Sequence, residues 1–202
     1  LDEIDKIVSR SEMAGADVSR QTLGVVGLGR IGRAVAQRAR GFDMTVLYHQ
    51  AERLPPGDEA ALGVRWASLD GLLAESDFVT LHCPLGPATR HLIDARRLRQ
   101  MKPTAYLVNT SRGPVVDEAA LAEALREGII AGAGLDVYER EPAVEAALLS
   151  LSDRVVLLPH VGSATHRTRR AMAARAVDAV DDVLAGRRPR HPVNPDALEV
   201  PR

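Results

Sequence analysis

Three apolar runs of the 202-residue chain end in polar side chains that could bind and protonate a substrate. Thr110, Ser111 and Arg112 follow "AYLVN", the acidic segment "DVYEREP" follows "AGAGL", and His160 follows "VVLLP". An arginine can hold a carboxylate through two parallel hydrogen bonds, and a histidine can protonate a developing alkoxide. A carboxylate behind that histidine favours its protonated form. These residue types suit hydride transfer to a keto acid.

Each of these side chains also has a purely structural explanation. Arg112 could be a surface charge, His160 a turn residue after proline, and Glu141 part of a solvated loop. The segment around Glu141 also carries Asp136 and Glu139. Because the carboxyl ends of parallel strands meet at one edge of a sheet, the joint placement of these residues favours a functional site.

A glycine pattern near the start of the chain is typical of a dinucleotide-binding turn. In "TLGVVGLGRIGRAV", Gly27, Gly29 and Gly32 form G-x-G-x-x-G between an apolar run and a helical segment. Gly27 permits the tight turn, Gly29 lets the backbone approach a pyrophosphate, and Gly32 lets helix and strand pack closely. The N–H groups near Arg30 and Ile31 would face the phosphates. The alternative is a structural turn without a ligand.

The end of the next apolar run bears on the choice of dinucleotide. An NAD enzyme places Asp or Glu there, whereas "VLYHQAER" places His49 or Gln50. The first acid, Glu52, lies in the loop beside Arg53. His49 and Arg53 could pair with a 2′-phosphate, so we expect NADP(H) to be preferred and NAD(H) to be possible. The alternative is that both are surface residues and that the site takes either cofactor.

Apolar runs alternate with helical patterns along the chain. Strands are predicted at 23–28, 44–49, 78–83, 105–110, 129–137 and 154–160, in a sheet of six or seven strands. Helices are predicted at 1–10, 30–42, 68–77, 94–103, 117–128 and 164–186. The predicted caps are Ser68, Asp94 and Asp117, and the predicted stops are Gly41, Pro103 and Gly128. The sequence therefore predicts an α/β fold, a doubly wound parallel sheet forming a Rossmann-type NAD(P)-binding domain.

Five segments resemble the D-isomer-specific 2-hydroxyacid dehydrogenases, and the glyoxylate/hydroxypyruvate reductase branch in particular. They are "LGVVGLGRIG", "LHCPLGPATRHLID", "MKPTAYLVNTSRGPVVDEAAL", "AGAGLDVYEREP" and "LPHVGSAT", in family order. The resemblance runs from about Thr22 to Pro192. It implies reduction of a 2-keto acid, of the glyoxylate or hydroxypyruvate type, to a D-2-hydroxy acid. "YHQAER" departs from the double-arginine loop of NADPH-dependent members, which leaves Arg53 to carry the phosphate.

The resemblance also assigns roles to individual residues. Arg112 becomes the substrate-binding and catalytic arginine, His160 the acid/base, and Glu141 the carboxylate that supports it. Asp136 would bond the nicotinamide carboxamide. The remaining residues assigned to the cofactor site are Arg30, Ile31, Cys83, Pro84, Thr89, Thr110, Ser111, His160 and Gly162.

Family members have a second domain, which here is expected to be missing. By resemblance, residues 1–20 are a linker helix and connection, 21–185 the dinucleotide-binding domain, and 186–202 a tail that would return to the substrate domain. Without the second domain, which forms the other wall of the substrate cleft, the site would be open to water, and this weakens electrostatic stabilisation. We therefore expect this chain to bind cofactor but to turn over slowly. The alternative is a non-catalytic NAD(P)(H)-binding module, and the resemblance also implies a homodimer through the cofactor domain.

Composition excludes several other classes of protein. The net charge of −1 gives no electrostatic footprint for nucleic acid or an anionic membrane. The single cysteine, Cys83, allows no internal disulfide, which favours a cytoplasmic, reducing compartment. No run is long enough to span a bilayer, and the charged start does not resemble a signal peptide. The histidines and carboxylates show no metal-ligand spacing, so no metal is expected.

Overall fold

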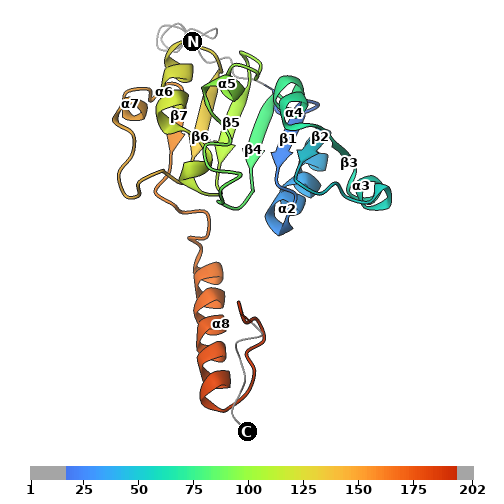
Figure 1. Cartoon of the computed structure of the whole chain (residues 1–202), viewed down its shortest axis with the longest axis vertical. Helices are drawn as coiled ribbons and strands as arrows, with labels where there is room; N and C mark the ends of the chain where they lie inside the picture. Colours follow the sequence, from blue (N-terminus) through green and yellow to red (C-terminus); the bar gives the residue numbers. More distant parts are fainter. Residues whose placement is uncertain (1–16, 195–202) are drawn as a thin grey trace, which may run out of the picture. The chain divides into compact units, whose positions relative to one another are not determined.

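A seven-stranded parallel sheet forms the centre of the computed structural model, which describes residues 17–194 (Figure 1). The strand order is β3-β2-β1-β4-β5-β6-β7. The strands are β1 (Thr22–Val26), β2 (Thr45–His49), β3 (Val64–Trp66), β4 (Phe78–Leu81), β5 (Tyr106–Asn109), β6 (Gly132–Leu135) and β7 (Val155–Leu157). Because strand order reverses between β1 and β4, the carboxyl ends of these strands border the crevice where such sheets bind ligands. The predicted doubly wound fold is confirmed.

Helices connect successive strands. They are α2 (Arg30–Ala39), α3 (Pro56–Leu62), α4 (Leu69–Glu75), α5 (Ala95–Leu98), α6 (Glu118–Arg126) and α7 (Ala146–Leu149), with 3-10 turns η1 (Arg40–Phe42) and η2 (Gly113–Val115); α8 (His166–Leu184) follows β7. All three predicted caps are confirmed. The side chains of Ser68, Asp94 and Asp117 accept hydrogen bonds from backbone N–H groups at the start of α4, α5 and α6.

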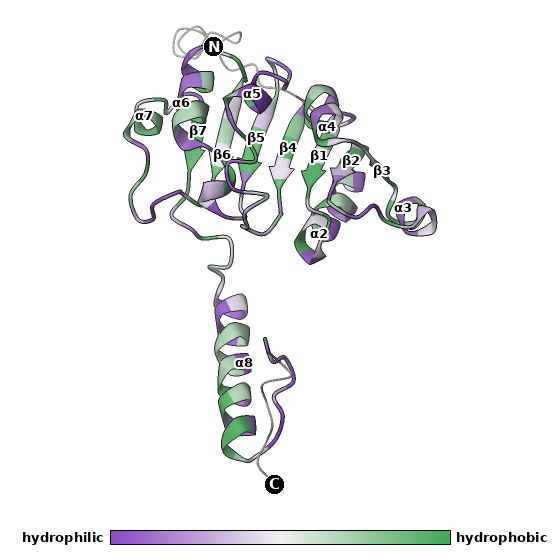
Figure 2. Cartoon of the chain, viewed as in Figure 1, coloured by the Kyte–Doolittle hydropathy of each residue, from purple (hydrophilic) through white to green (hydrophobic). Residues whose placement is uncertain are grey.

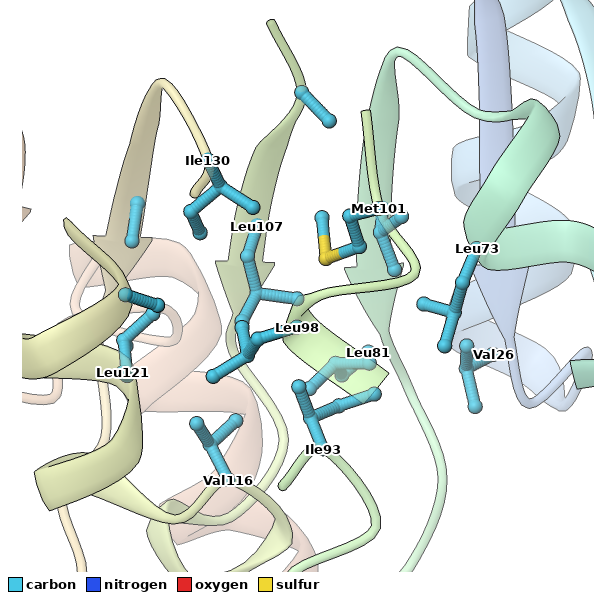
Figure 3. Close-up of a cluster of buried hydrophobic side chains, with 14 of the residues drawn as sticks. Val26, Leu73, Leu81, Ile93, Leu98, Met101, Leu107, Val116, Leu121 and Ile130 are labelled. Atoms are coloured by element: carbon cyan, nitrogen blue, oxygen red, sulfur yellow. The ribbon is translucent and has the colours of Figure 1, made fainter. Parts of the chain in front are cut away.

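Two buried clusters hold the helices against the sheet. Val25 and Val26 of β1 point to opposite faces, so this strand contributes to both clusters. The larger cluster packs the strands against α4, α5 and α6, and includes Leu73, Leu98 and Leu107 (Figure 3). The smaller one packs β1, β2 and β3 against α2 and α3. Figure 2 shows hydrophobic residues concentrated in the strands, as expected for a sheet covered by helices.

The structure corrects several predicted boundaries. The helix predicted to end at Gly41 instead ends through η1, and Asp43 takes the left-handed conformation with φ 54°. Helix α5 is only four residues long and stops well before Pro103. Helix α3 and strand β3 were not predicted, because "PPGDEAALGVRW" has few apolar residues and begins with two prolines.

The chain divides into two compact units, residues 1–159 and 160–202. In the second unit, Thr165 caps α8, and no residue of α8 is buried. Hydrophobic and hydrophilic residues alternate along this helix (Figure 2). Its exposed apolar side chains include Met172, Val177, Val180, Val183 and Leu184. The predicted helix at 1–10 and the end of the predicted tail lie outside the described residues. Between residues 17 and 194, no helix is both long enough and apolar enough to cross a membrane.

Candidate cofactor-binding and active site

A cleft of about 590 Å³ lies at the carboxyl end of the sheet, within the first unit. The loops after β1, β4 and β5 contribute its walls. It is lined by Arg30, Ile31, His82, Cys83, Pro84, Leu85, Thr110, Ser111 and Arg112. The structure thus brings together seven of the residues predicted for cofactor and substrate. Arg30 and Ile31 were predicted from the glycine pattern and Thr110 to Arg112 from their place after an apolar run, whereas Cys83 and Pro84 were predicted from the family resemblance.

The glycine turn forms one end of this cleft. Gly27 has φ +93°, and a Cβ there would lie 2.7 Å from the backbone nitrogen of Cys83. A Cβ at Gly32 would lie 2.1 Å from the carbonyl oxygen of Gly27, so the helix could not approach the turn with any larger residue. A Cβ at Gly29, in contrast, would meet no atom within 4 Å. The open space therefore lies beside Gly29, which caps the N-terminus of α2.

The N-terminus of α2 suits an anion. Gly29 caps the helix without a side-chain hydrogen bond, and the first turn carries no acidic residue. A second hollow of about 460 Å³ adjoins this end and is lined by Gly29, Arg30, Ile31 and His82. Free N–H groups and the helix dipole make such an end an anion-binding site. These residues therefore fit the pyrophosphate of a dinucleotide.

The loop after β5 places Arg112 in the cleft. Asn109, at the end of β5, is 1% exposed and supports this loop. Its side-chain amide donates to the carbonyl oxygen of Arg112 at 3.0 Å, and its own oxygen accepts from the N–H of Ser111 at 3.1 Å. Arg112 itself is exposed. The guanidinium thus lies at the surface of the cleft on a loop that a buried amide holds in shape.

Two residues at the end of β4 have uncharged side chains at neutral pH. Burial lowers the pKa of His82, whose Nε2 lies 3.0 Å from Oγ1 of Thr80. Burial raises the pKa of the Cys83 thiol, which argues against a nucleophilic thiolate. Sequence reasoning missed His82 as a cleft residue, although its place directly after a buried strand was a usable signal.

The structure does not place Thr89 among the residues that line the cleft. Its hydroxyl donates to the carbonyl oxygen of Pro84 at 2.6 Å and accepts from the N–H of Gly86 at 2.8 Å. Thr89 therefore closes the loop that carries Pro84 into the cleft. Its predicted contact with the cofactor stays a prediction.

The segment after β6 is packed against the arginine loop. A Cβ at Gly113 would lie 1.8 Å from the carbonyl carbon of Tyr138, so only glycine permits this approach. Glu141 accepts a hydrogen bond from the N–H of Tyr138 at 3.1 Å. Asp136 is 5% exposed, and its N–H donates to the carbonyl oxygen of Asn109 at 3.0 Å. Asp136 and Glu141 thus lie on a segment that is fixed to the end of β5.

His160 and Gly162 belong to the second unit, which begins at His160. His160 has a left-handed backbone, with φ 53°, a conformation that is uncommon for residues other than glycine. The N–H of Ala164 donates to the carbonyl oxygen of Val161 at 2.8 Å, which forms a turn before α8. His160 lies three residues after the end of β7, whereas the predicted strand ran to residue 160.

The loop after β2 gives a result that the sequence did not predict. His49 Nδ1 lies 3.1 Å from the carbonyl oxygen of Ala67, and Gln50 accepts the N–H of Leu28 at 3.2 Å. Arg53, expected to meet a 2′-phosphate, pairs with Glu59 of α3 at 2.8 Å. The analysis of the sequence considered carboxylates only at the strand end and did not include Glu59.

No group of three or more His, Cys, Asp or Glu between residues 17 and 194 is arranged to hold a metal ion.

Comparison with known proteins agrees with this geometry. The sequence profile described as "D-isomer specific 2-hydroxyacid dehydrogenase, NAD binding domain" matches residues 3–162. The chain is 52% identical over 187 residues to glyoxylate/hydroxypyruvate reductase B of Shigella boydii, covering 92% of this chain and 57% of that protein. It is 50% identical over 188 residues to glyoxylate reductase of Korarchaeum cryptofilum, covering 93% and 56%.

A solved structure shows the same likeness. The crystal structure of a glyoxylate reductase from Paecilomyes thermophila superposes with a TM-score of 0.79 at 43% identity, covering 85% of this chain and 52% of that one. The chain thus spans little more than half the length of the relatives it matches. With its seven-stranded sheet, glycine turn and arginine-lined cleft, it belongs to the D-isomer specific 2-hydroxyacid dehydrogenase family and carries the NAD-binding domain of that family.

Proposed function

We propose that this chain is the cofactor-binding half of a reductase that converts a 2-keto acid of the glyoxylate or hydroxypyruvate type into a D-2-hydroxy acid. The cleft that joins the N-terminus of α2 to Arg112 carries this proposal. It provides an anion site for a dinucleotide at one end and a carboxylate-binding cation at the other. The names of the similar proteins support the same substrate class.

The cofactor is held, in this proposal, by three loops of the sheet edge. The glycine turn from Gly27 to Gly32 binds the pyrophosphate through backbone N–H groups. The side walls come from Cys83, Pro84, Thr89, Thr110 and Ser111, with Asp136 and Gly162 toward the nicotinamide. A bound nicotinamide dinucleotide supplies a hydride for the keto carbon.

The chain's own side chains supply binding and proton transfer. Arg112 grips the substrate carboxylate and orients the keto group. His160 donates a proton to the carbonyl oxygen as it becomes an alkoxide, and Glu141 stabilises the protonated imidazole. The carbonyl π bond breaks, new C–H and O–H bonds form, and His160 is left neutral until solvent reprotonates it.

We further propose a preference for NADPH over NADH. The end of β2 carries His49 and Gln50, without the carboxylate that would bond a ribose 2′-hydroxyl and repel a 2′-phosphate. Arg53 lies four residues beyond His49, and its side chain is 58% exposed. Both features favour NADPH, although Glu59 already shares the charge of Arg53.

We also propose that the protein forms a homodimer and that it works in a reducing, cytoplasmic compartment. The exposed apolar side chains of α8, including Met172 and Leu184, support an interface with another polypeptide. Sedimentation at micromolar concentration tests the dimer, and a monomer would count against it. The single cysteine, buried Cys83, suits a compartment where disulfides do not form.

The test of the proposed function is oxidation of NADPH or NADH by the purified chain, followed at 340 nm with glyoxylate and hydroxypyruvate. We expect slow turnover that requires the keto acid. His160→Ala should abolish this turnover and leave cofactor affinity, measured by nicotinamide fluorescence, within about twofold. Unchanged turnover in that variant, or failure to bind either cofactor, would overturn the proposal. Cofactor binding without any turnover would favour the non-catalytic binding module.

A further inference from the structure

Arg53 is held in a two-point ion pair on the outer part of the sheet. Its Nε donates to Oε1 of Glu59 at 2.8 Å and its Nη2 donates to Oε2 at 2.9 Å. The guanidinium also lies over the ring of Trp66, 5.8 Å from the ring centroid. The Glu59 side chain is only 11% exposed, so the carboxylate is well shielded from water. Two parallel charge-assisted hydrogen bonds fix the direction as well as the position of an arginine.

A buried tyrosine fixes the other partner of this pair. The hydroxyl of Tyr48 donates to Oε1 of Glu59 at 2.7 Å and accepts from the N–H of Leu54 at 2.8 Å. Tyr48 is fully buried in β2. The hydrogen bonds from Arg53 and then Tyr48 lower the pKa of Glu59 to about 2. Glu59 is therefore negatively charged at every pH where the protein would work.

The ion pair of Arg53 and Glu59 lies next to the part of the fold that distinguishes NADP from NAD. In doubly wound sheets, the residues just after β2 meet the ribose 2′ position of the cofactor. Arg53, in the loop that leaves β2, is the arginine we propose for the 2′-phosphate. Glu59 already neutralises it, so an approaching phosphate meets an ion pair and no free cation. Part of the attraction that Arg53 could exert on the phosphate is thereby cancelled.

We propose that Glu59 is a specificity-determining residue, which holds Arg53 and thereby limits how strongly the protein prefers a 2′-phosphorylated dinucleotide over an unphosphorylated one. This inference rests on the proposed cofactor function. Glu59 acts through Arg53 and does not touch the cofactor. Neutralising Glu59 releases a full positive charge, and the phosphate carries up to two negative charges. The gain in attraction between Arg53 and the phosphate outweighs the cost of leaving the exposed Arg53 side chain less ordered.

The main test compares wild type with Glu59→Gln. Glutamine has the same shape, and its oxygen still accepts the Tyr48 hydroxyl, but it carries no charge. Dissociation constants for NADPH and NADH are measured by nicotinamide fluorescence, with circular dichroism to verify the fold. We expect NADPH to bind about five- to tenfold more tightly in the variant, because a charged hydrogen bond is stronger than a neutral one. NADH affinity should stay within about twofold, since NADH has no 2′-phosphate.

Asp58→Asn is the matched control. Asp58 precedes Glu59 on α3, is exposed, and loses the same charge on substitution. We expect the ratio of NADPH to NADH affinity to stay within about twofold, because loss of one exposed, screened charge has little effect. An equal gain in both variants would attribute the effect to net charge and overturn the role of Glu59.

Two further measurements test the same inference. In the double variant Arg53→Ala with Glu59→Gln, NADPH affinity should fall by less than about tenfold, because Glu59 already cancels part of the attraction of Arg53 in wild type. The wild-type chain should bind adenosine 2′,5′-bisphosphate and 5′-AMP within about tenfold of each other, since one partly cancelled charge adds little to binding. This second measurement needs no variant.

The outcomes separate this inference from the proposed function. If both cofactors bind to wild type, but Glu59→Gln leaves their ratio unchanged or lowers it, the inference is wrong and the proposed function stands. A loss of about tenfold or more in the double variant, or a preference of more than about tenfold for the bisphosphate, would also overturn it, because Arg53 would then already be available. If wild type binds neither cofactor, the proposed function itself fails, and the inference with it.

Discussion

The side-chain amide of Asn109 donates a hydrogen bond to the backbone carbonyl of Arg112 at 3.0 Å. Its oxygen accepts two more hydrogen bonds from Ser111, from the N–H at 3.1 Å and from the hydroxyl at 2.9 Å. Because Asn109 is 1% exposed, water does not readily replace these bonds. The bend that presents Arg112 to the cleft therefore depends on one buried amide.

Asn109→Ala should weaken both the fold and the site. Removing the amide takes away three hydrogen bonds of a partly buried loop, which costs about 1–3 kcal/mol in the free energy of unfolding, measured with urea. Cofactor affinity, measured by fluorescence on the folded variant, should also fall, because the loop of Thr110 to Arg112 loses its support. Ser111→Ala removes only one of the three bonds and should cost about 0.5–1.5 kcal/mol. Equal stability of Asn109→Ala and wild type would show that the loop is held by other contacts.

Two glycines of the turn should respond differently to alanine. Gly32→Ala places a Cβ 2.1 Å from the oxygen of Gly27, so the backbone must shift. We expect a loss of about 1–3 kcal/mol in the free energy of unfolding. Gly29→Ala meets no atom within 4 Å, and the residue has φ −71°, which alanine adopts readily. This variant should keep its stability and lose about tenfold or more in cofactor affinity, because the methyl group occupies the pyrophosphate side.

The control for both glycine variants is Gly57→Ala in α3, where an added Cβ also meets nothing within 4 Å. It should leave cofactor affinity unchanged and be neutral or stabilising by about 0.5 kcal/mol. If Gly29→Ala binds cofactor as well as this control does, the pyrophosphate does not lie against Gly29.

Glu118 should make stability depend on pH. Burial and, to a lesser degree, the nearby charge of Glu139 raise the pKa of Glu118, while the N–H of Glu139 donates to it and opposes this shift. A carboxyl with a raised pKa in the folded state favours folding in its protonated form. Its contribution is complete below the pKa of the unfolded chain and is lost as pH rises through the folded pKa. Glu118→Gln should therefore gain stability relative to wild type as pH rises from about 4.3 to 8.

Urea unfolding at several pH values measures this trend. Glu123→Gln, on the exposed side of α6, is the control and should change stability by roughly 0.5 kcal/mol or less at each pH. A constant difference between Glu118→Gln and wild type across the range would show that Glu118 does not titrate differently in the two states.

Glu59 should stabilise the fold in its charged form, so its effect on the pH dependence of stability is opposite to that of Glu118. Its pKa is lowered to about 2 by the hydrogen bonds from Arg53 and Tyr48, so its charged form stabilises the fold. That contribution is present above the pKa of the unfolded chain, about 4.3, and is lost as pH falls toward 2. Glu59→Gln should consequently unfold with a shallower dependence on pH over this window. Acid titration followed by circular dichroism checks this, and parallel curves would refute it.

Local sequence patterns predicted most of the strands and three of the helix starts in the first unit. Apolar runs of strand length identified six of the seven strands, and short polar side chains at Ser68, Asp94 and Asp117 identified three helix starts. Parallel strands that are buried on both faces need such runs, and caps need a side-chain oxygen at one position. The glycine turn and the residues after β5 could also be placed, because parallel strands end at a shared edge, whereas the residues after β4 were assigned through the family resemblance.

Tertiary structure decided what depends on contacts between distant or irregular segments. Strand β3 has three residues and exists because it pairs with β2, which no local pattern reveals. The sequence did not distinguish Asn109 from other polar residues, whereas the structure shows that it is buried and supports the loop of Arg112. The pairing of Arg53 with Glu59 required a helix that the sequence did not predict, and it depends on Tyr48 below it. Such relationships follow from packing in three dimensions, where burial and direction decide which charges meet.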